Sequence, residues 1–573
     1  VSSVVSSKNI TVMNRIVECV PNFSEGRDKA VIRQITSAIE SSGGVKLLDV
    51  DPGEATNRTV VTFVGSPEAV IEAAFAGVKR ADMRRHKGAH PRMGATDVLP
   101  LIPICGITLA ECAELARKLA ERIAAELHVP TYCYEAAAFT PERRNLAVCR
   151  AGEYEALPEK LAHTASAPDF GVRPFDEGVA RTGATTVGAR DFLIAVNFNL
   201  NTTSTRRANA IAFDVREKGR PVREGNPITG RVVKDAAGNP VMQPGTLPAT
   251  KAIGWFIEEY GIAQVSMNIT DISRTPLHAA FDEVCRKADA RGLRVTGTEI
   301  VGLVPKRALV EAGKYFLRKQ RRSTGVAEEE IVRIAVKSMG LDDLKPFDPA
   351  EKVIEYLLEA EVPKKRLIDM TCKAFAEETA SESPAPGGGS IAAYMGALGA
   401  ALGTMVANLS SHKAGWDDRW EEFSDWAERG QAVLAELLHL VDEDTAAFNR
   451  IMAVFAMPKS TDEERAARAA ALQEATLYAT EVPLRTMKAA SRVFEIVRAM
   501  ASEGNPNSVS DAGVGALAAR SAVLGACLNV KINAAGLKDR AVADALTAEA
   551  DALAAEAVRL EAEVLQIVES KIG

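Results

Sequence analysis

Two of the seven histidines in this 573-residue chain, His86 and His90, lie four positions apart in the string H-K-G-A-H-P-R-M-G-A-T-D. Histidine exchanges protons near neutral pH, so the string predicts a general acid or base. The same spacing could place two metal ligands on one face of a helix. Gly88 and Pro91 disfavour a helix, and the H-E-x-x-H pattern is absent from the string. Proton transfer is therefore favoured over a metal site or a polar turn with incidental histidines.

Other polar strings in the first half follow segments that resemble strands. Asn22 lies in P-N-F-S-E-G, Asp51 in D-V-D-P-G and Arg58 in N-R-T. Loops at strand ends carry the functional groups of many α/β proteins. Arg58 and Arg92 could each hold a carboxylate by two parallel hydrogen bonds, although surface ion pairing explains either one alone. The glycine-punctuated loop Gly171–Gly183 could line a flat ligand, but that signal is weak.

The second half contains three further polar strings. S-P-A-P-G-G-G-S precedes a helix, where free N–H groups suit an anion, and a flexible linker is the alternative. Asp444, in V-D-E-D, could act chemically or belong to an acidic cap of the following helix. The third string, G-N-P-N-S-V-S-D, contains side chains that could bind a ligand or only cap a helix. The candidate binding residues in the first and third strings are Gly388, Ser390, Asn507, Ser510 and Asp511.

The elements that must position the first polar strings alternate between strands and helices. Hydrophobic periodicity predicts this pattern, and it indicates an α/β or α+β sheet covered on one or both faces. A second α/β unit of similar size is expected from residue 191, interrupted by a Gly/Pro-rich excursion at 218–248. The predicted strands are 15–21, 45–50, 59–63, 96–104, 129–134, 192–200, 264–271 and 298–305; the predicted helices are 28–42, 67–84, 109–127, 201–217 and 276–291.

Composition changes near residue 364, where β-branched runs almost disappear and alanine rises. Long amphipathic helices with short connections predict an all-α up-and-down bundle. The predicted helices are 366–380, 390–411, 416–441, 442–457, 462–481, 483–503, 510–528 and 540–571. The predicted divisions are a flexible tail at 1–14, α/β subdomains at 15–190 and 191–352, a linker at 353–365 and a helical domain at 366–573.

Bulk properties exclude several classes of protein. The net charge of −7 gives no long-range attraction to nucleic acid or to an anionic membrane. The eight cysteines form no C-x-x-C pair, which indicates free thiols in a reducing cytoplasm. Ile391–Ser410 is charge-free and long enough to span a bilayer. Because alanine and glycine dominate it and no second span is predicted, a buried bundle helix is favoured over a membrane span.

Several strings in the first half resemble the glutamate formiminotransferase family. They are V-E-C-V-P-N-F-S-E-G, D-V-D-x-G, T-N-R-T, H-K-G-A-H-P-R-M-G-A, R-A-G-E-Y-E-A-L-P-E-K-L and A-P-D-F-G, in the expected order between residues 15 and 352. The resemblance implies two α/β subdomains with a folate groove between them. It implies that His90 is the catalytic histidine, with Asp51 as a nearby acid that orients or stabilises it. The loop from Gly171 to Gly183 would contact folate.

Strings in the second half resemble the cyclodeaminase family: S-P-A-P-G-G-G-S, V-D-E-D-T-A-A-F and G-N-x-N-S-V-S-D-A-G. Their order after a formiminotransferase unit is similar to the bifunctional formimidoyltransferase-cyclodeaminase family of histidine breakdown. The resemblance implies that Asp444 is the catalytic carboxylate. It also implies a homo-oligomer that dimerises through the helical domain around that site.

The expected reaction moves a formimino group from N-formimino-glutamate to N5 of tetrahydrofolate, with or without a polyglutamate tail. The product then closes to 5,10-methenyl-tetrahydrofolate and releases ammonia. A histidine near its ordinary pKa of ~6.5 can remove the N5 proton and protonate the departing nitrogen. No metal or redox cofactor is expected. The alternatives are formyl transfer from N-formyl-glutamate and a non-catalytic folate-binding scaffold.

Overall fold

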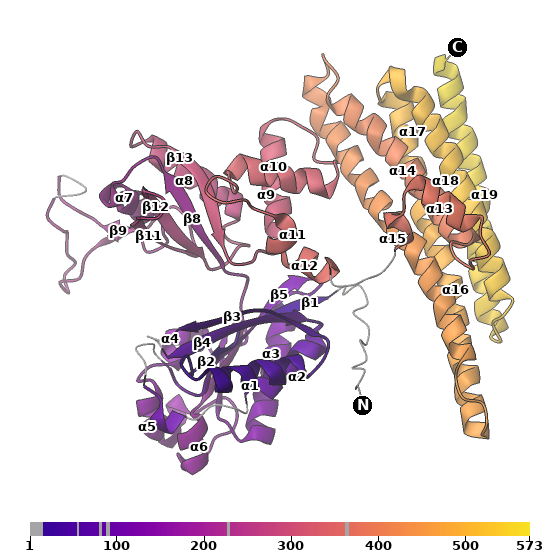
Figure 1. Cartoon of the computed structure of the whole chain (residues 1–573). Coiled ribbons are helices and arrows are strands. Elements are labelled where there is room, and N and C mark those ends of the chain that lie inside the picture. Colours follow the sequence, from indigo (N-terminus) through magenta and orange to yellow (C-terminus); the bar gives the residue numbers. More distant parts are fainter. Residues whose placement is uncertain are drawn as a thin grey trace. The chain divides into compact units, whose positions relative to one another are not determined.

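The structure of the chain, a computed structural model, describes residues 15–53, 57–78, 83–87, 92–225, 230–360 and 366–572. The chain packs as two compact units (Figure 1). The α/β unit contains the residues up to Leu309 together with Met339–Val362, and the helical unit contains Val310–Ser338 and the residues from Pro363 onward. A mixed sheet region that precedes a mostly helical region confirms the predicted fold class.

The first sheet of the α/β unit has seven strands in the order β1-β4-β2-β5-β7-β6, with β3 paired to β4. β7 pairs in parallel with β5 and β6, whereas the other pairings are antiparallel. The short β7 was not predicted from the sequence. The strands are β1 (Ile16–Cys19), β2 (Asn22–Phe23), β3 (Val45–Gly53), β4 (Arg58–Gly65), β5 (Thr96–Cys105), β6 (Thr131–Glu135) and β7 (Thr185–Ala189).

Both faces of this sheet are covered. Three helices pack side by side on one face, around a core that includes Phe23, Phe63 and Leu101. Because successive strand residues point to opposite faces, Tyr132 and Tyr134 enter a second core under two short helices. The helices of this subdomain are α1 (Lys29–Glu40), α2 (Pro67–Gly77), α3 (Leu109–Leu127), α4 (Leu146–Cys149), α5 (Leu157–Ala162) and α6 (Glu177–Thr182).

The second sheet has four antiparallel strands in the order β11-β12-β8-β13. The strand β11, which begins directly after the Gly/Pro-rich excursion, was not predicted from the sequence. Two helices, α7 and α8, pack against this sheet. The elements are β8 (Ile194–Leu200), α7 (Thr205–Val215), β11 (Thr250–Ile257), β12 (Ile262–Ile269), α8 (Leu277–Asp289) and β13 (Val295–Val301); α11 (Pro349–Lys352) and α12 (Ile354–Ala360) complete the unit.

The excursion at 218–248 is a hairpin with very short paired segments, β9 (Arg220–Pro221) and β10 (Met242–Gln243). Isolated bridges join Arg223 to Val232 and Lys234 to Pro240 farther along it. Most of its described side chains are exposed, so the hairpin contributes little to the core.

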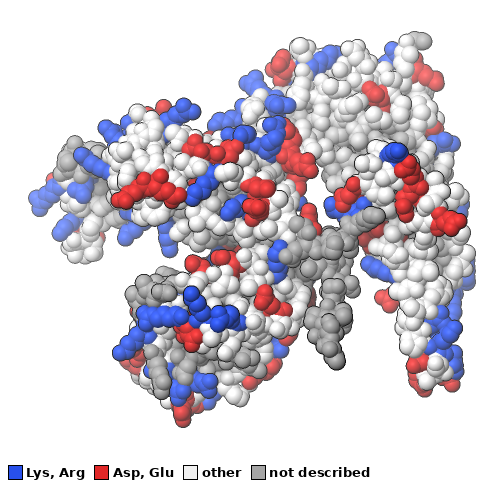
Figure 2. Space-filling model, in the orientation of Figure 1, with Lys and Arg blue, Asp and Glu red and all other residues white. Residues whose placement is uncertain are grey.

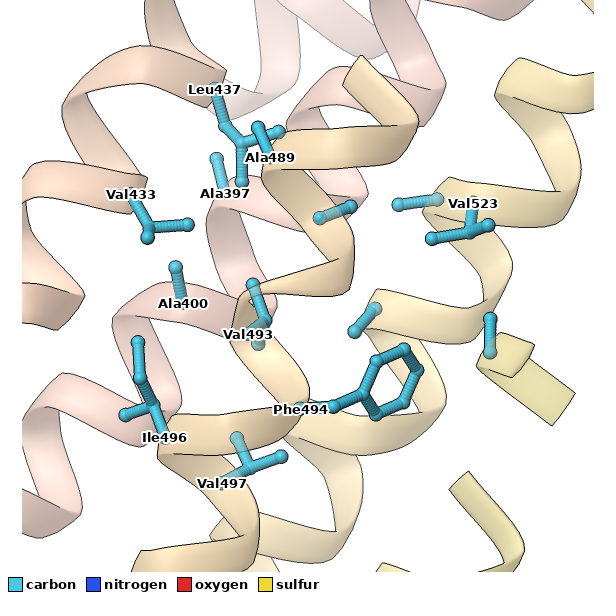
Figure 3. Packing of buried hydrophobic residues seen from close by; sticks show 14 of the residues in the cluster. Ala397, Ala400, Val433, Leu437, Ala489, Val493, Phe494, Ile496, Val497 and Val523 are labelled. Atoms are coloured by element: carbon cyan, nitrogen blue, oxygen red, sulfur yellow. The ribbon is translucent and has the colours of Figure 1, made fainter. Parts of the chain in front are cut away.

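The helical unit consists of long antiparallel helices around an alanine-rich core (Figure 3). One end of α14 contacts α15 through Ser390 and Val441, and the other end through Ser411 and Trp420. Small residues let backbones approach closely; a Cβ at Gly399 would lie 2.9 Å from a carbonyl oxygen of α18. The helices are α13 (Cys372–Thr379), α14 (Gly388–Ser411), α15 (Trp420–Phe455), α16 (Asp462–Ser491), α17 (Val493–Glu503), α18 (Val509–Ala534) and α19 (Arg540–Ile572).

Two predicted helix boundaries in this unit are wrong. α15 continues through the acidic string, so Asp444 does not belong to a cap. α16 continues through Pro483, which has no N–H to donate to the Ala479 carbonyl one turn earlier. The Asn533 side chain of α18 donates to that carbonyl instead, at 2.6 Å. A distant residue therefore stabilises a helix that local sequence rules would end.

Residues 310–338 follow the second sheet in the chain but pack with the helical unit. They include most of α9 (Lys306–Lys319) and α10 (Glu328–Met339). In the loop between these helices, the Thr324 N–H donates to the Ser424 hydroxyl of α15 at 3.0 Å. A Cβ at Gly325 would lie 2.3 Å from Ala427, so only glycine fits there.

Two helices of the helical unit are long and apolar enough to cross a membrane, by length and composition only: Gly388–Ser411 and Pro506–Ala534. Only the first of these two helices was recognised in the sequence as long enough to span a bilayer. In the most apolar window of the first helix 61% of the residues are buried inside the unit, and in that of the second helix 50% are buried. Core helices of bundles pass the same test, so this finding is weak evidence for a span.

Candidate active sites

Asn57 joins the polar strings of the α/β unit. Its side-chain oxygen accepts from the Gly26 N–H at 2.9 Å, and its amide donates to the Lys87 carbonyl at 3.1 Å. The His86 ring nitrogen Nε2 lies 2.7 Å from the Asn57 carbonyl oxygen. Asn57 adopts a φ of +49°, a left-handed conformation that asparagine tolerates. One residue thus holds together three loops that are far apart in the sequence.

His90, the predicted catalytic residue, lies outside the described residues, with Gly88, Ala89 and Pro91. The described residues nearest to it in the sequence, Lys87 and Arg92, line a hollow of about 470 Å³.

A larger cavity of about 1140 Å³ opens between the two sheets of the α/β unit. The first subdomain contributes Asn22 and Arg58, and the second contributes Lys251 and Arg274. Its cationic lining residues are Arg58, Arg144, Arg150, Arg190, Lys251 and Arg274; its acidic ones are Glu135, Glu153, Asp191, Glu217 and Asp271. A cavity with this many guanidinium groups suits a ligand that carries several carboxylates.

At one end of this cavity a buried cluster fixes two arginines. Arg58 donates to the Asn22 side-chain oxygen, and Arg150 forms an ion pair with Asp97. Burial, with the nearby Arg150 charge, lowers the pKa of Arg58, and Asp97 opposes that shift. The other Asp97 oxygen accepts from the Met93 N–H at 2.9 Å. Asp97 therefore compensates two partly buried cations and anchors the string that contains His90.

The other predicted residues of this unit occupy different environments. Arg92 is held by Glu153 at 3.0 Å and by Glu155 at 2.6 Å, so its guanidinium already binds carboxylates. Asp51 is exposed on β3, and the described residues that line the large cavity do not include it.

The two predicted loop glycines have positive φ, +74° at Gly171 and +66° at Gly183. A Cβ at Gly183 would lie 2.5 Å from the Cα of Gly94. The end of this loop therefore packs tightly against the string that contains His90 and Arg92.

Several cavity cations were not predicted from the sequence. Arg144, Arg150, Arg190, Lys251 and Arg274 come from segments far apart in the chain, and none stands in a polar string that a local pattern would single out. The quoted string R-A-G-E-Y-E-A-L-P-E-K-L begins with Arg150, and that resemblance was the available signal.

The second site lies at the N-terminus of α14. The Ser390 hydroxyl donates to the Val441 carbonyl at 2.9 Å and approaches Asp444 Oδ2 at 3.1 Å. A Cβ at Gly389 would lie only 2.1 Å from Asp444 Oδ1, so the carboxylate occupies the space that glycine leaves. Burial raises the pKa of Asp444, while hydrogen bonds from the Ser390 hydroxyl and N–H oppose that shift. A raised pKa favours a carboxyl group that can hold a proton as well as release one.

Gly388 lies beside Asn529 of α18, since a Cβ there would be 3.6 Å from that amide. The remaining predicted residues, Asn507, Ser510 and Asp511, lie at the opposite end of α14. There the Asn505 N–H donates to the Ser410 hydroxyl at 2.8 Å. At 1.5 Å per residue, Ser390 and Ser410 are about 30 Å apart along the helix. Within a single chain, Asn507, Ser510 and Asp511 are therefore far from Asp444.

Among the residues that the structure describes, no group of three or more His, Cys, Asp or Glu side chains could hold a metal ion. His90 is not among them.

The fold and these sites define a class of protein with two candidate sites, an α/β groove lined by several cations and a buried carboxylate in a helical bundle. The family described as "Formiminotransferase domain, N-terminal subdomain" matches residues 16–190, and "Formiminotransferase domain" matches residues 195–359. The family described as "Formiminotransferase-cyclodeaminase" matches residues 371–552.

Named relatives agree with these matches. Rat formimidoyltransferase-cyclodeaminase is 43% identical over 531 residues, which cover 92% of this chain and 94% of that protein. Glutamate formimidoyltransferase of Streptococcus pyogenes serotype M1 is 41% identical and covers 53% of this chain and 94% of its own length. Methenyltetrahydrofolate cyclohydrolase of Methylorubrum extorquens is 40% identical and covers 35% of this chain and 97% of its own length. The chain belongs to the formiminotransferase-cyclodeaminase family, as the sequence strings predicted.

Proposed function

We propose that the chain transfers a formimino group from N-formimino-glutamate to N5 of tetrahydrofolate and then cyclises the product to 5,10-methenyl-tetrahydrofolate. The observation that carries this proposal is the presence, in one chain, of a cation-lined groove and a buried carboxylate on separate units. Each half resembles a relative whose name describes a single activity, glutamate formimidoyl transfer for the first half and methenyltetrahydrofolate cyclohydrolysis for the second.

In the first step, N5 of the pterin attacks the amidine carbon and gives a tetrahedral adduct. His90 takes the N5 proton and returns a proton to the glutamate nitrogen as the C–N bond breaks. The cavity cations bind the carboxylates of the donor and of the folate glutamates, whether one or several are present. Asp51 is proposed to act on His90, and this step uses no metal.

In the second step, N10 attacks the same carbon, and the formimino nitrogen leaves as ammonia. N10 must lose its proton, and the formimino nitrogen, which carries one hydrogen, must gain two before it leaves. One offsets the proton lost from N10, and the other comes from solvent and leaves the positive charge on the methenyl product. Asp444 is suited to both transfers because burial raises its pKa. Free N–H groups at the start of α14 would hold a polar edge or a carboxylate of the folate.

The helical unit is proposed to act as a homodimer. Its α14 exposes Leu398, Met405 and Leu409, at spacings of seven and four residues. The neighbouring α18 exposes a second set of apolar side chains: Val514, Leu517, Leu528 and Ile532. Leu528 is 70% exposed and Ile532 is 73% exposed, values that favour burial against a second copy.

A two-fold axis through the middle of this apolar face would set α14 antiparallel to α14 of the second copy. The Asp444 end of one chain would then lie beside the Asn507–Asp511 end of the other. This arrangement supports the proposal because it unites the cyclodeaminase residues that one chain separates by about 30 Å. Each dimer would contain two composite sites.

The two activities can be tested separately by stopped-flow absorbance with tetrahydrofolate and N-formimino-glutamate. His90→Ala should release no glutamate, whereas Asp444→Ala should release glutamate and stall before methenyl-tetrahydrofolate and ammonia appear. The exposed residues His163 and Asp425 provide control variants, His163→Ala and Asp425→Ala, which should keep both activities. If the chain turns over only N-formyl-glutamate, that compound replaces N-formimino-glutamate as the donor. If neither donor reacts, the proposed activity is wrong and the folate-binding scaffold remains as the alternative.

The composite site can be tested by mixing inactive chains. Asp444→Ala and Asp511→Ala homodimers should each lack cyclodeaminase activity. After subunit exchange at equal amounts, about one quarter of the sites should be intact. No recovery in exchanged dimers, verified by differently tagged chains, would contradict the antiparallel arrangement. The proposed context of the enzyme is histidine breakdown in the cytoplasm.

A further inference from the structure

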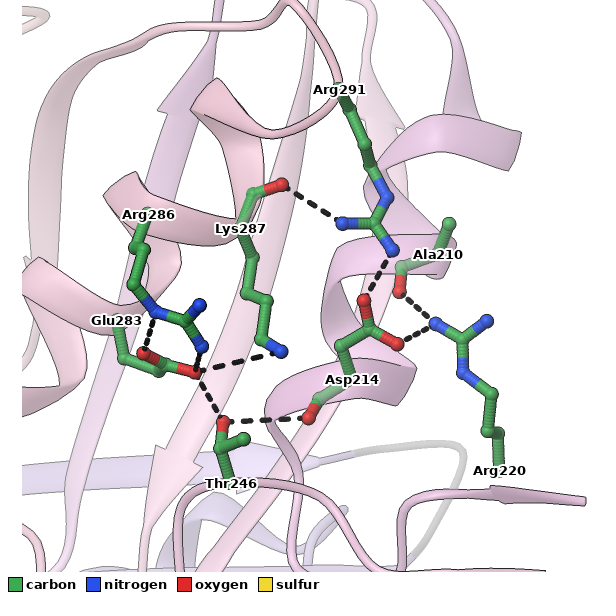
Figure 4. Close-up of polar contacts among 8 residues, drawn as sticks. All are labelled: Ala210, Asp214, Arg220, Thr246, Glu283, Arg286, Lys287 and Arg291. Carbon is green, nitrogen blue, oxygen red and sulfur yellow. Dashed lines mark hydrogen bonds and ion pairs between the residues drawn. The ribbon is translucent and has the colours of Figure 1, made fainter. Parts of the chain in front are cut away.

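The hairpin at 218–248 is anchored at both ends on α7 and α8 (Figure 4). Asp214 of α7 forms ion pairs with Arg220, at the start of the hairpin, and with Arg291 after α8. At the other end, the Thr246 hydroxyl donates to Glu283 of α8 at 2.6 Å. The base of this exposed hairpin is therefore held in a fixed position against the second subdomain.

A hollow of about 420 Å³ lies between the hairpin base and α7. α7 contributes Arg206, Asn209 and Phe213, and the hairpin contributes Arg220 and Arg223. The side-chain oxygen of Asn209 accepts from the Gly254 N–H and its side-chain nitrogen donates to the Gly254 carbonyl, so this residue is part of the fold. The polar groups that remain in the hollow belong to arginines, and none of its described lining residues is acidic.

Positive charge around this hollow exceeds negative charge. The Asp214 carboxylate is shared between two guanidinium groups, one of which lines the hollow. Burial lowers the pKa of Arg220, and the Arg291 charge lowers it further. Arg206 has no ion pair or hydrogen bond to any described side chain. Figure 2 shows Lys and Arg gathered at this end of the second subdomain.

Arginines in such an arrangement favour a particular ligand chemistry. A guanidinium group donates two parallel hydrogen bonds to one oxyanion, and three such groups can satisfy the several oxygens of a phosphate. The remaining walls, which include Phe213 and Pro221, are apolar and could cover an organic group. The Arg216 guanidinium lies 4.1 Å from the centroid of the Phe213 ring and fixes that wall.

We propose that this hollow is a binding site for a phosphate group, separate from both active sites, with Arg206, Arg220 and Arg223 as its ligands. The phosphate enters either as the free ion or as a small phosphate monoester whose organic part lies against Phe213 and Pro221. The hairpin supplies two of the three arginines, so the site depends on this excursion.

The test is calorimetric titration of the full chain, in a phosphate-free buffer, with inorganic phosphate and with adenosine monophosphate. Arg206→Ala should weaken binding by roughly ten-fold or more, the usual effect of removing a charged hydrogen-bond donor. Arg206→Glu should abolish it. The matched controls are Arg231→Ala and Arg231→Glu, since Arg231 is exposed on the same hairpin and does not line the hollow.

Tighter binding of the monoester than of phosphate would assign the apolar walls to an organic group, and equal affinity would assign the site to the free ion. Arg223→Ala should also weaken binding, and added salt should weaken it further. The proposal is overturned if the wild type shows no saturable binding at millimolar phosphate. It is equally overturned if the Arg206 and Arg231 variants bind alike.

Discussion

Gly389 offers a way to displace the Asp444 carboxylate without removing it. Gly389→Ala adds one methyl group at the start of α14, and that methyl would lie 2.1 Å from Asp444 Oδ1 and 2.5 Å from its Cγ. Gly388→Ala adds the same group one residue earlier, where the nearest atom is 3.6 Å away. A comparison of these two variants therefore distinguishes the effect of moving the carboxylate from the general effect of placing alanine in this turn.

The expected loss follows from the distance by which the carboxylate must move. Ordinary contact begins at 3.4 Å, so Oδ1 must retreat by more than 1 Å. That movement would disrupt the approach of Ser390 to Asp444 Oδ2, which is 3.1 Å in the structure. A displacement of about 1 Å at a reacting group typically reduces the rate by roughly 10²-fold. We expect a loss of that size in cyclisation for Gly389→Ala and a much smaller loss for Gly388→Ala.

The assay follows glutamate release and methenyl-tetrahydrofolate formation in the same reaction. Glutamate release reports the α/β unit and should be unchanged in both variants, which excludes a general failure to fold. The formimino intermediate should accumulate only in Gly389→Ala. Equal cyclisation rates in the two variants would refute the idea that the position of Asp444 limits this step.

Three further predictions follow from buried polar groups. Burial raises the pKa of Asp444, so the stability that its protonated form contributes is fully present below pH 3.8, its ordinary pKa, and is lost as pH rises through the pKa of the folded state. Asp444→Asn should therefore be more thermally stable than the wild type only at higher pH. A stability difference that does not vary with pH would contradict the raised pKa. Asn533→Ala leaves the Ala479 carbonyl without its donor and should lower the free energy of unfolding by about 1–3 kcal/mol in urea denaturation. Adding Pro483→Ala should restore stability, because alanine supplies the backbone N–H that proline lacks. Failure of that rescue would argue against the contact. The side chains of Asp97 and Arg150 are only 2% and 14% exposed, so Asp97→Asn should lower the free energy of unfolding by about 3–5 kcal/mol and impair the transferase. Glu177→Gln should change stability little, because it removes only an exposed ion pair. Similar unfolding curves for the two variants would refute this difference.

The sequence alone determined the order of the two units and most of their elements. Hydrophobic periodicity is a local property, and it placed α3 at Leu109–Leu127 and the first strands close to their observed limits. The polar strings were also visible locally, because each is a short run of functional side chains at the end of an element. Their resemblance to known families then gave both the family and the candidate residues, including His90 and Asp444.

Only the tertiary structure decided which of these residues meet. Arg150, Arg190 and Lys251 gather in one cavity because the end of α4, the end of β7 and the start of β11 place them there from distant parts of the sequence. α16 passes through Pro483 because Asn533, fifty residues away, satisfies the Ala479 carbonyl. The Asn507–Asp511 string lies far from Asp444 because α14 and α18 are antiparallel and long. Such outcomes depend on packing and on hydrogen bonds between distant segments, which no local pattern in a sequence encodes.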